Sequence, residues 1–151
     1  MLITKETDYA LRILRSLSEG GSFTVGELTD KEQLPREFAY KILKKLEKAG
    51  MVQIIRGAKG GCFLDCDLKK ISLFDVIKSI ETKTRISACM DPGYDCNWRK
   101  ETNTNCMIHG RLKMVQAAVD NELKSWSLHQ VLNGGEETED KILRAPVTSN
   151  N

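Results

Sequence analysis

The amino-acid sequence predicts a mainly helical fold that carries one small β-hairpin, and three observations support this prediction. Apolar residues recur at helical spacing in several segments, a glycine-rich turn joins two short strand-like runs, and a long helical stretch lies near the end of the chain. Of the 151 residues, 40% are hydrophobic and 29% are charged, which is typical of a globular protein. We therefore expect a packed core rather than a disordered chain.

Three helices are expected early in the chain, over residues 4–20, 24–30 and 35–50. Thr4 can cap the first helix, Thr24 can form a capping box with Glu27 in the second, and Pro35 suits the first turn of the third. Two of these helices have apolar residues on one face, which we expect to lie inward: Ala10, Ile13, Leu14 and Leu17, then Ala39, Ile42, Leu43 and Leu46.

A β-hairpin is expected after the third helix. A strand over 51–56 and a return strand over 62–67 flank the turn at 57–61, which contains three glycines. Cys62 and Cys66 fall on one face of the return strand, so both are expected to be small core side chains rather than ligands. Three helices followed by such a hairpin is the element order of a winged helix-turn-helix domain, which we expect to end at residue 81 after a fourth helix capped by Ser72.

The remainder of the chain divides into three predicted segments. Residues 82–107 lose helical periodicity and are expected to form a cysteine-rich loop, and residues 134–151 are expected to form a flexible tail. Between them, residues 108–133 are expected to form one long helix. Its apolar stripe, suited to packing on a second subunit, consists of Ile108, Leu112, Val115, Val119 and Trp126.

Basic residues concentrate in the third helix and the hairpin turn. Residues 35–60 contain seven lysines and arginines but only two acidic residues, although the net charge of the chain is only +2. A helix fits the major groove of double-stranded DNA, and an arginine beside a tight turn can enter a minor groove. An ordinary helical domain with a basic surface is the alternative, but the element order favours DNA. The residues expected to contact DNA are Arg36, Tyr40, Lys41, Lys44, Lys45, Arg56 and Lys59.

Three cysteines and a histidine share one short region, in the pattern Cys89-x6-Cys96-x9-Cys106-x2-His109. Thiolates and a neutral imidazole suit zinc or the iron of an iron–sulfur cluster. Structural zinc sites usually contain a tight pair about two to four residues apart, and only Cys106 and His109 are that close, so a cluster is favoured over zinc. A reversible disulfide, exposed thiols and a buried cysteine remain as alternatives.

Several classes of protein are disfavoured. No apolar run approaches the ~20 residues of a membrane span, and the first residues lack the features of a signal peptide. We therefore expect a cytoplasmic protein without a membrane partner, in a compartment that keeps thiols reduced. The sequence contains no nucleotide loop, no nucleophile motif and no paired catalytic carboxylates, so an enzyme is not expected.

These features together resemble the Rrf-two family of transcription regulators, the group that includes IscR and NsrR. The resemblance covers about residues 1–133, and the combination of its wing with a three-cysteine loop is specific. The segments that carry it are Leu2-Ile3-Thr4, Asp8-Tyr9-Ala10-Leu11-Arg12, Leu46 to Gly50, Arg56-Gly57-Ala58-Lys59-Gly60-Gly61 and Ile71-Ser72-Leu73-Phe74-Asp75-Val76-Ile77.

The resemblance implies a homodimeric repressor that binds a pseudo-palindromic DNA operator and is joined through the long helix. It implies that Cys89, Cys96 and Cys106 ligate an iron–sulfur cluster. Asp8 from the other subunit looks like the fourth ligand of the 4Fe–4S arrangement of NsrR, whereas His109 looks like the fourth ligand of the 2Fe–2S arrangement of IscR. We favour Asp8, because the segment around it matches the nitric-oxide-sensing branch well.

The functional hypothesis is a regulator whose operator affinity is set by this cluster, which senses nitric oxide, redox state or iron–sulfur supply. The alternative is a cluster-free regulator of the same fold that is switched by a disulfide among its loop cysteines. Two departures from the family pattern bear on the nuclearity of the cluster and on the signal that it senses: the gaps between the loop cysteines are longer than usual, and Cys62 stands where an aromatic residue often follows the wing glycines.

Overall fold

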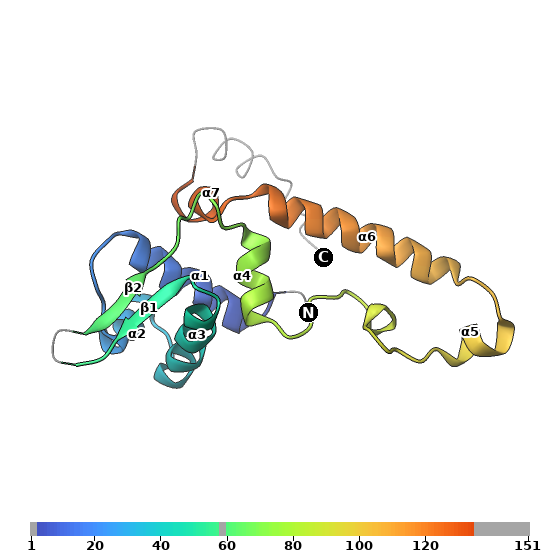
Figure 1. Cartoon of the computed structure of the whole chain (residues 1–151), viewed down its shortest axis with the longest axis horizontal. Helices are drawn as coiled ribbons and strands as arrows, with labels where there is room; N and C mark the ends of the chain where they lie inside the picture. The colour runs from blue at the N-terminus through green and yellow to red at the C-terminus, as the bar shows by residue number, and fades with distance from the viewer. Residues whose placement is uncertain (1–2, 58–59, 135–151) are drawn as a thin grey trace, which may run out of the picture.

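A computed structural model describes residues 3–57 and 60–134 of the chain. The described helices and strands are α1 (Lys5–Ser18), α2 (Val25–Glu32), α3 (Arg36–Lys48), β1 (Val52–Ile55), β2 (Gly61–Leu64), α4 (Leu73–Ile80), η1 (Ala88–Met90), α5 (Asn97–Thr102), α6 (Met107–Ser125) and α7 (Leu128–Asn133). Figure 1 shows two parts, a rounded body and a long arm that projects from it. We call residues 82–125 the arm and the other described residues the body. The mainly helical fold with a winged helix-turn-helix order is as predicted.

Local signals in the sequence set the starts of the body helices. The Thr4 hydroxyl accepts a hydrogen bond from the Glu6 amide at 3.2 Å and so caps α1. Thr24 and Glu27 form the predicted capping box of α2, and Ser72 forms another with Asp75 at α4. These caps satisfy amide groups that a helix leaves without partners in its first turn.

The core of the body is formed by the inward faces of its helices. The eight predicted core residues of α1 and α3 are all buried. Val76 and Ile80 of α4 and Leu128 of α7 belong to the same core cluster, and Ile77 of α4 is also buried. Each of these fully buried side chains stabilises the fold by roughly 1.5–3 kcal/mol relative to an exposed position.

The hairpin pairs β1 with β2 in antiparallel register, with Val52 opposite Leu64. The turn requires glycine, because a Cβ atom at Gly60 would lie 2.1 Å from the carbonyl oxygen of Ile55. Cys62 is only 1% exposed and belongs to the core, as predicted. The strand ends at Leu64, however, so Cys66 lies beyond the strand on which it was predicted and is only half-buried.

The prediction of one long helix over 108–133 is wrong, because the structure divides this segment between α6 and α7. The chain between these helices is extended and pairs with the segment before α4, and a capping box of Ser127 with Gln130 then starts α7. Three backbone hydrogen bonds form this pairing: Leu73 N to Trp126 O at 3.0 Å, Leu128 N to Ile71 O at 2.7 Å, and His129 N to Leu68 O at 3.0 Å. The core therefore takes up Leu128, and Trp126 does not continue the stripe of α6.

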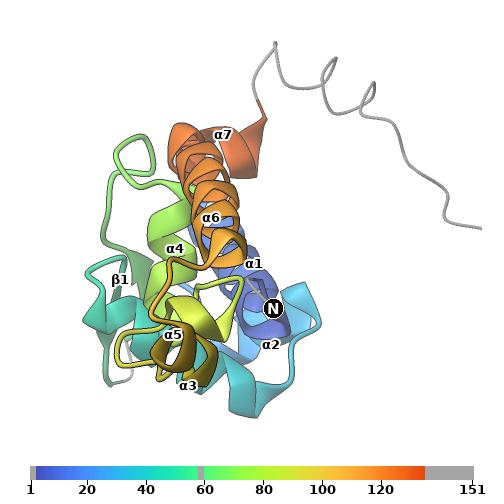
Figure 2. The same ribbon diagram turned by 90° about the vertical axis from the view of Figure 1, so that its right-hand side faces the viewer.

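The arm consists of two antiparallel layers. Residues 82–106 run outward from the body, and α6 returns along them (Figure 1). Figure 2 shows the same arrangement along the arm, with α6 above α5. The predicted loop thus contains two short helices, η1 and α5. No helix in the described part of the chain combines the length and apolar character that a membrane span requires.

Candidate nucleic-acid interface and cysteine site

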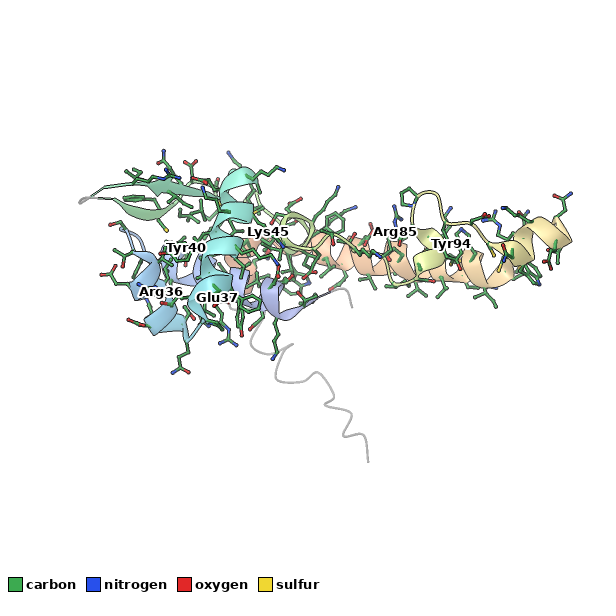
Figure 3. The ribbon with its side chains drawn as sticks, turned by 90° about the horizontal axis from the view of Figure 1, so that it is seen from below. Arg36, Glu37, Tyr40, Lys45, Arg85 and Tyr94 are labelled. Carbon is green, nitrogen blue, oxygen red and sulfur yellow. The ribbon has the colours of Figure 1, made fainter. Side chains whose placement is uncertain are left out.

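The outer face of α3 carries most of the residues predicted to contact DNA. Arg36, Tyr40, Lys41 and Lys44 are exposed, because the opposite face of α3 is buried in the core. Figure 3 shows Arg36, Glu37 and Tyr40 along this helix. Tyr40 is 55% exposed, which is unusual for a large aromatic side chain without a partner to cover it.

The position of α3 is fixed by contacts with α1 and α2. The Phe38 ring packs edge-on against the Tyr9 ring of α1, with 5.9 Å between ring centroids. The Arg36 guanidinium lies so close to α2 that a Cβ atom at Gly26 would be 3.3 Å from it. These contacts hold α3 at the surface with its basic face outward, which suits a helix that enters a DNA groove.

Three of the predicted lysines differ in their surroundings. Lys44 pairs with Glu47 at 3.0 Å on the exposed surface, and such a pair contributes little to stability. Lys41 and Lys45 both donate to the Glu6 carboxylate of α1, at 2.7 and 2.6 Å. Hydrogen bonds from Lys41 and then Lys45 lower the pKa of Glu6. Lys45 also donates to the carbonyl oxygen of Ile80 at 2.8 Å, so its ammonium group is turned toward the body.

The wing places Arg56 on the exposed surface directly after β1. Lys59, the other predicted wing contact, lies outside the described residues. Together with α3, Arg56 gives this side of the body two separate basic elements, as a winged helix domain uses when it contacts two grooves of DNA.

The arm brings Cys89, Cys106 and His109 together. The Cys89 sulfur lies 3.5 Å from Nδ1 of His109 and accepts a hydrogen bond from the Ser87 hydroxyl at 3.2 Å. The Cys106 sulfur accepts a hydrogen bond from the backbone N–H of His109 at 3.4 Å, and so caps α6. The Cys89 thiol and the His109 imidazole, which come from two separate segments, therefore meet where η1 lies against α6, and Cys106 lies at the start of that helix.

Cys96 lies apart from this cluster, at the residue before α5. It lines a shallow hollow of about 360 Å³ together with Tyr94 and Arg99. Within residues 3–57 and 60–134 of a single chain, no three His, Cys, Asp or Glu side chains converge closely enough to hold a metal ion. The donor chemistry of the predicted ligands fits an iron–sulfur cluster, and two of the three cysteines, Cys89 and Cys106, each contact His109.

Asp8 lies on α1 and pairs with Arg12 at 2.9 Å. Both residues line a cavity of about 410 Å³ between α1 and α7, with Val131 and Leu132 on its other side. The Asp8 side chain is 49% exposed, so a second subunit can approach it. The predicted role of Asp8 as a ligand from the other subunit remains a prediction.

Gln116 is a positioning residue that the sequence reasoning missed. It is 6% exposed, and its amide accepts from Ile86 N at 2.8 Å and donates to Thr84 O at 3.3 Å and to Asp120 at 2.7 Å. Gln116 therefore fixes the chain that leads to Cys89, two helical turns from His109 on the same helix. The signal in the sequence was a polar residue two turns from His109, beside Leu112 and Val119 of the apolar stripe.

The body is thus a winged helix domain of the kind found in transcription regulators, with a cysteine-bearing arm. A family model described as "Rrf2: Iron-dependent Transcriptional regulator" matches residues 3–134, and the chain belongs to this family, which is the Rrf-two family of the sequence resemblance. Members of this family are transcription regulators rather than enzymes.

One curated relative and two solved structures are similar to this chain. Protein aau3 of Rhizobium meliloti (strain 1021) is 34% identical over 99 residues, which cover 64% of this chain and 64% of the relative. The structure of CymR, the global cysteine regulator of B. subtilis, has a TM-score of 0.64 at 22% identity and covers 90% of this chain and 99% of that one. T. potens IscR has a TM-score of 0.62 at 20% identity, covering 91% and 90% of the two chains. The two structures support the fold alone.

Proposed function

We propose that this protein is a homodimeric repressor that binds an operator in double-stranded DNA and whose affinity is set by the cysteines of the arm. The observation that carries this proposal is that Cys89 and Cys106 each contact His109, in an arm that joins directly to the winged helix body. Figure 1 shows that both ends of the arm return to the body beside α4, so a change in the arm reaches the body through two connections.

The DNA surface consists of α3 and the wing. Arg36, Tyr40 and Lys44 would contact base edges and phosphates in the major groove, and Arg56 would contact the neighbouring minor groove. Two copies related by a two-fold axis would place their α3 helices about 34 Å apart, which matches successive major grooves on one side of DNA.

The dimer is supported by an exposed apolar face on α6. Met107 and Ile108 are each 72% exposed, Met114 is 63% exposed and Val115 is 51% exposed. These residues lie at spacings of seven, so they occupy one side of the helix over two turns. A second copy of α6 is the occupant we propose for this face, because such a stripe suits helix pairing and costs free energy when it contacts water.

We propose an iron–sulfur cluster as the sensor, held by Cys89, Cys96 and Cys106, with Asp8 of the second subunit or His109 as the fourth ligand. The soft donors of the arm, the family description and the similarity to T. potens IscR support this assignment. When bound, the cluster would supply iron that reacts with nitric oxide or oxidants. In a single chain Cys89 and Cys106 each contact His109, whereas Cys96 precedes α5 and would have to approach them.

A second candidate sensor is a disulfide among the arm cysteines, without a cluster. The partial exposure of all three arm cysteines favours it, because a thiol must be accessible to an oxidant before it can form a disulfide. The structural similarity to CymR, which includes an oxidised form of the S. aureus protein, also fits this alternative.

The DNA-binding part is tested with DNA selected from a randomised pool. Arg36→Ala and Lys44→Ala should each weaken binding, because each removes a cation from α3. The slope of log affinity against log salt concentration should fall by about one in each variant, as expected for the loss of one phosphate contact. Lys69→Ala removes an exposed cation outside α3 and serves as the matched control. Equal binding by all four proteins would show that α3 does not contact DNA.

The sensor is tested by anaerobic reconstitution with ferrous iron and sulfide. We expect iron and sulfide to be retained by the native chain and lost from Cys96→Ser. Asp8→Ala and His109→Ala then identify the fourth ligand, which we expect to be Asp8. A chain that retains no iron, but loses DNA affinity reversibly with a thiol oxidant, would instead support the disulfide candidate.

A further inference from the structure

A cluster of polar side chains lies where α4 ends and the arm begins. Its members come from α1, α3 and the end of α4: Thr4, Glu6, Thr7, Lys41, Lys45 and Glu81. We call this cluster the polar junction. A cavity of about 510 Å³ lies against it and is also lined by Thr82, the first residue of the arm. The junction is therefore the place at which the arm meets the helix that we assign to DNA binding.

Glu81 links the base of the arm to α1. One of its carboxylate oxygens accepts from the Thr4 amide at 3.2 Å and from the Thr4 and Thr7 hydroxyls, each at 2.5 Å. Thr7 is completely buried. A carboxylate at the end of its own helix, α4, is on the unfavourable side of the helix dipole, but the start of α1 offsets this. Glu81 is thus held by α1, one residue before the arm begins.

Lys45 links the same point to α3. Its ammonium group donates both to the Ile80 carbonyl oxygen at 2.8 Å and to Glu6 at 2.6 Å. The Lys45 side chain is only 27% exposed. Figure 3 shows Lys45 on the side of α3 that faces the arm, away from Arg36 and Glu37. A shift of the last turn of α4 would therefore act directly on Lys45.

Glu6 divides its two carboxylate oxygens between the lysines of α3. One oxygen accepts from Lys41 and the other accepts from Lys45. The Lys41 side chain is 59% exposed, and Lys41 is also a predicted phosphate contact. A DNA phosphate must therefore compete with Glu6 for the Lys41 ammonium group.

We propose that the polar junction couples the position of the arm to the DNA affinity of α3, through Glu81, Lys45 and Glu6. This inference rests on the proposed function and names the regulation of its DNA-binding surface. When the junction is closed, Glu6 holds both lysines. When the arm moves Ile80 and Glu81, Lys45 loses one partner, Glu6 shifts toward Lys45, and Lys41 becomes available to phosphate. The adjoining cavity leaves room for this exchange.

The first experiment measures operator affinity in the reduced, metal-free protein and in protein reconstituted with ferrous iron and sulfide. In the native chain the two affinities should differ by a factor within roughly 5–150, the usual range of coupling between sites. In Glu81→Gln and in Glu6→Gln this factor should fall to about twofold or less. Glu6→Gln should also bind more tightly at low salt, because it no longer competes with phosphate.

The matched control is Glu47→Gln. It removes the same charge from a carboxylate that holds a lysine of α3, Lys44, but it does not touch the arm. The affinity of Glu47→Gln for DNA should rise with the change in charge, whereas the ratio of the two affinities should stay native. A native ratio in Glu81→Gln and Glu6→Gln would overturn the inference, as would an equal loss of the ratio in Glu47→Gln.

A second measurement separates this inference from the proposed function. Gln116→Leu removes the contact of α6 with Thr84 and Ile86 and so disturbs the arm without DNA or metal. Amide hydrogen exchange in the first turn of α1 should then rise at least about threefold, and Glu81→Gln should cancel this response. Unchanged exchange would overturn the coupling even if the operator affinity is regulated. If exchange in α1 rises but operator affinity is the same with and without iron and sulfide, the proposed function is overturned, whereas the coupling between the arm and α1 is retained.

Discussion

The body and the arm bury different kinds of side chain. The body buries apolar residues from α1 to α4 and from α7 in one continuous core. Within residues 82–127, all of which the structure describes, only Gln116 is buried, and it is polar. Four apolar residues of α6, Met107, Ile108, Met114 and Val115, face solvent instead. The body therefore has its own source of stability, whereas the arm leaves an apolar face uncovered, which the second copy that we propose would cover.

The cysteines follow the same division. Burial raises the pKa of the Cys62 and Cys66 thiols in the body, and the nearby acidic side chains add to the effect. The three arm cysteines are partly exposed. Thiolates are the reactive and metal-binding form of cysteine, so the body cysteines are suited to packing and the arm cysteines to chemistry.

The largest effect is expected where the arm meets a second copy. Val115→Asp places a charge in the middle of the proposed dimer interface and should cost about 3–5 kcal/mol of association free energy, because the charge would be buried without a partner. Sedimentation should then show monomers with a native circular dichroism spectrum. The control is Lys113→Asp, on the same helix outside the apolar stripe. A dimer that survives Val115→Asp would place the interface elsewhere.

A similar effect is expected in the body. Leu128 is completely buried although it lies beyond the arm, so Leu128→Ala should reduce the free energy of unfolding by roughly 2–5 kcal/mol through lost contacts and a cavity. Val131→Ala, which changes a residue of α7 that is 36% exposed, should cost far less. Urea unfolding of both variants tests this. Equal losses would mean that α7 is not part of the core.

A buried carboxylate makes the stability of the body depend on pH. Burial of Glu32 opposes its ionisation, but hydrogen bonds from Arg15 and Ser16 outweigh this and lower the pKa of Glu32 below 4.5. Because the pKa is lower in the folded state, the stabilisation is present above pH 4.5 and is lost as the pH falls through the folded value. Glu32→Gln should cost about 1.5–3 kcal/mol at neutral pH and progressively less in acid. A difference that is constant with pH would contradict this.

Within the arm, Gln116→Leu should have a smaller effect. The substitution leaves the Ile86 N–H and the Thr84 carbonyl without the amide that binds them, at about 1–3 kcal/mol locally. Hydrogen exchange should rise over residues 84–90 and, apart from the first turn of α1, stay native in the body. Asn121→Leu, at an exposed position of α6, is the control. If both variants exchange alike, Gln116 does not position the cysteine segment.

The sequence predicted the body in detail because its signals are local. The caps at Thr4, Thr24 and Ser72 and the apolar spacing of α1 and α3 correspond directly to the helices observed. Each of these features depends on residues within a few positions of one another, which is the range that a pattern in the sequence reports.

The arm was predicted less well because its contacts join residues far apart in the chain. The break between α6 and α7 arises because residues 126–129 pair through their backbone with the segment before α4. No local pattern in the sequence predicts this pairing. The contact of Cys89 with His109 joins residues 20 positions apart, and the hydrogen bond from Ile86 to Gln116 joins residues 30 positions apart. The spacing of the cysteines predicted that they are ligands. It did not predict that Cys89 and Cys106 contact His109 whereas Cys96 lies apart, before α5.

The smallest effect is a difference in rate between the two groups of cysteines. Iodoacetamide reacts with the thiolate, so the raised pKa of Cys62 and the nearly complete burial of its side chain should make it at least about tenfold slower than Cys89, Cys96 and Cys106 in the metal-free folded protein. Cys66, which is half-buried but also has a raised pKa, should react at an intermediate rate. Mass spectrometry of proteolytic peptides after timed alkylation gives each rate. In guanidinium chloride all five rates should converge, because unfolding exposes every thiol to solvent. If Cys62 reacts as fast as Cys96 in the folded protein, the hairpin opens readily to solvent. The body would then not protect its cysteine better than the arm protects its own.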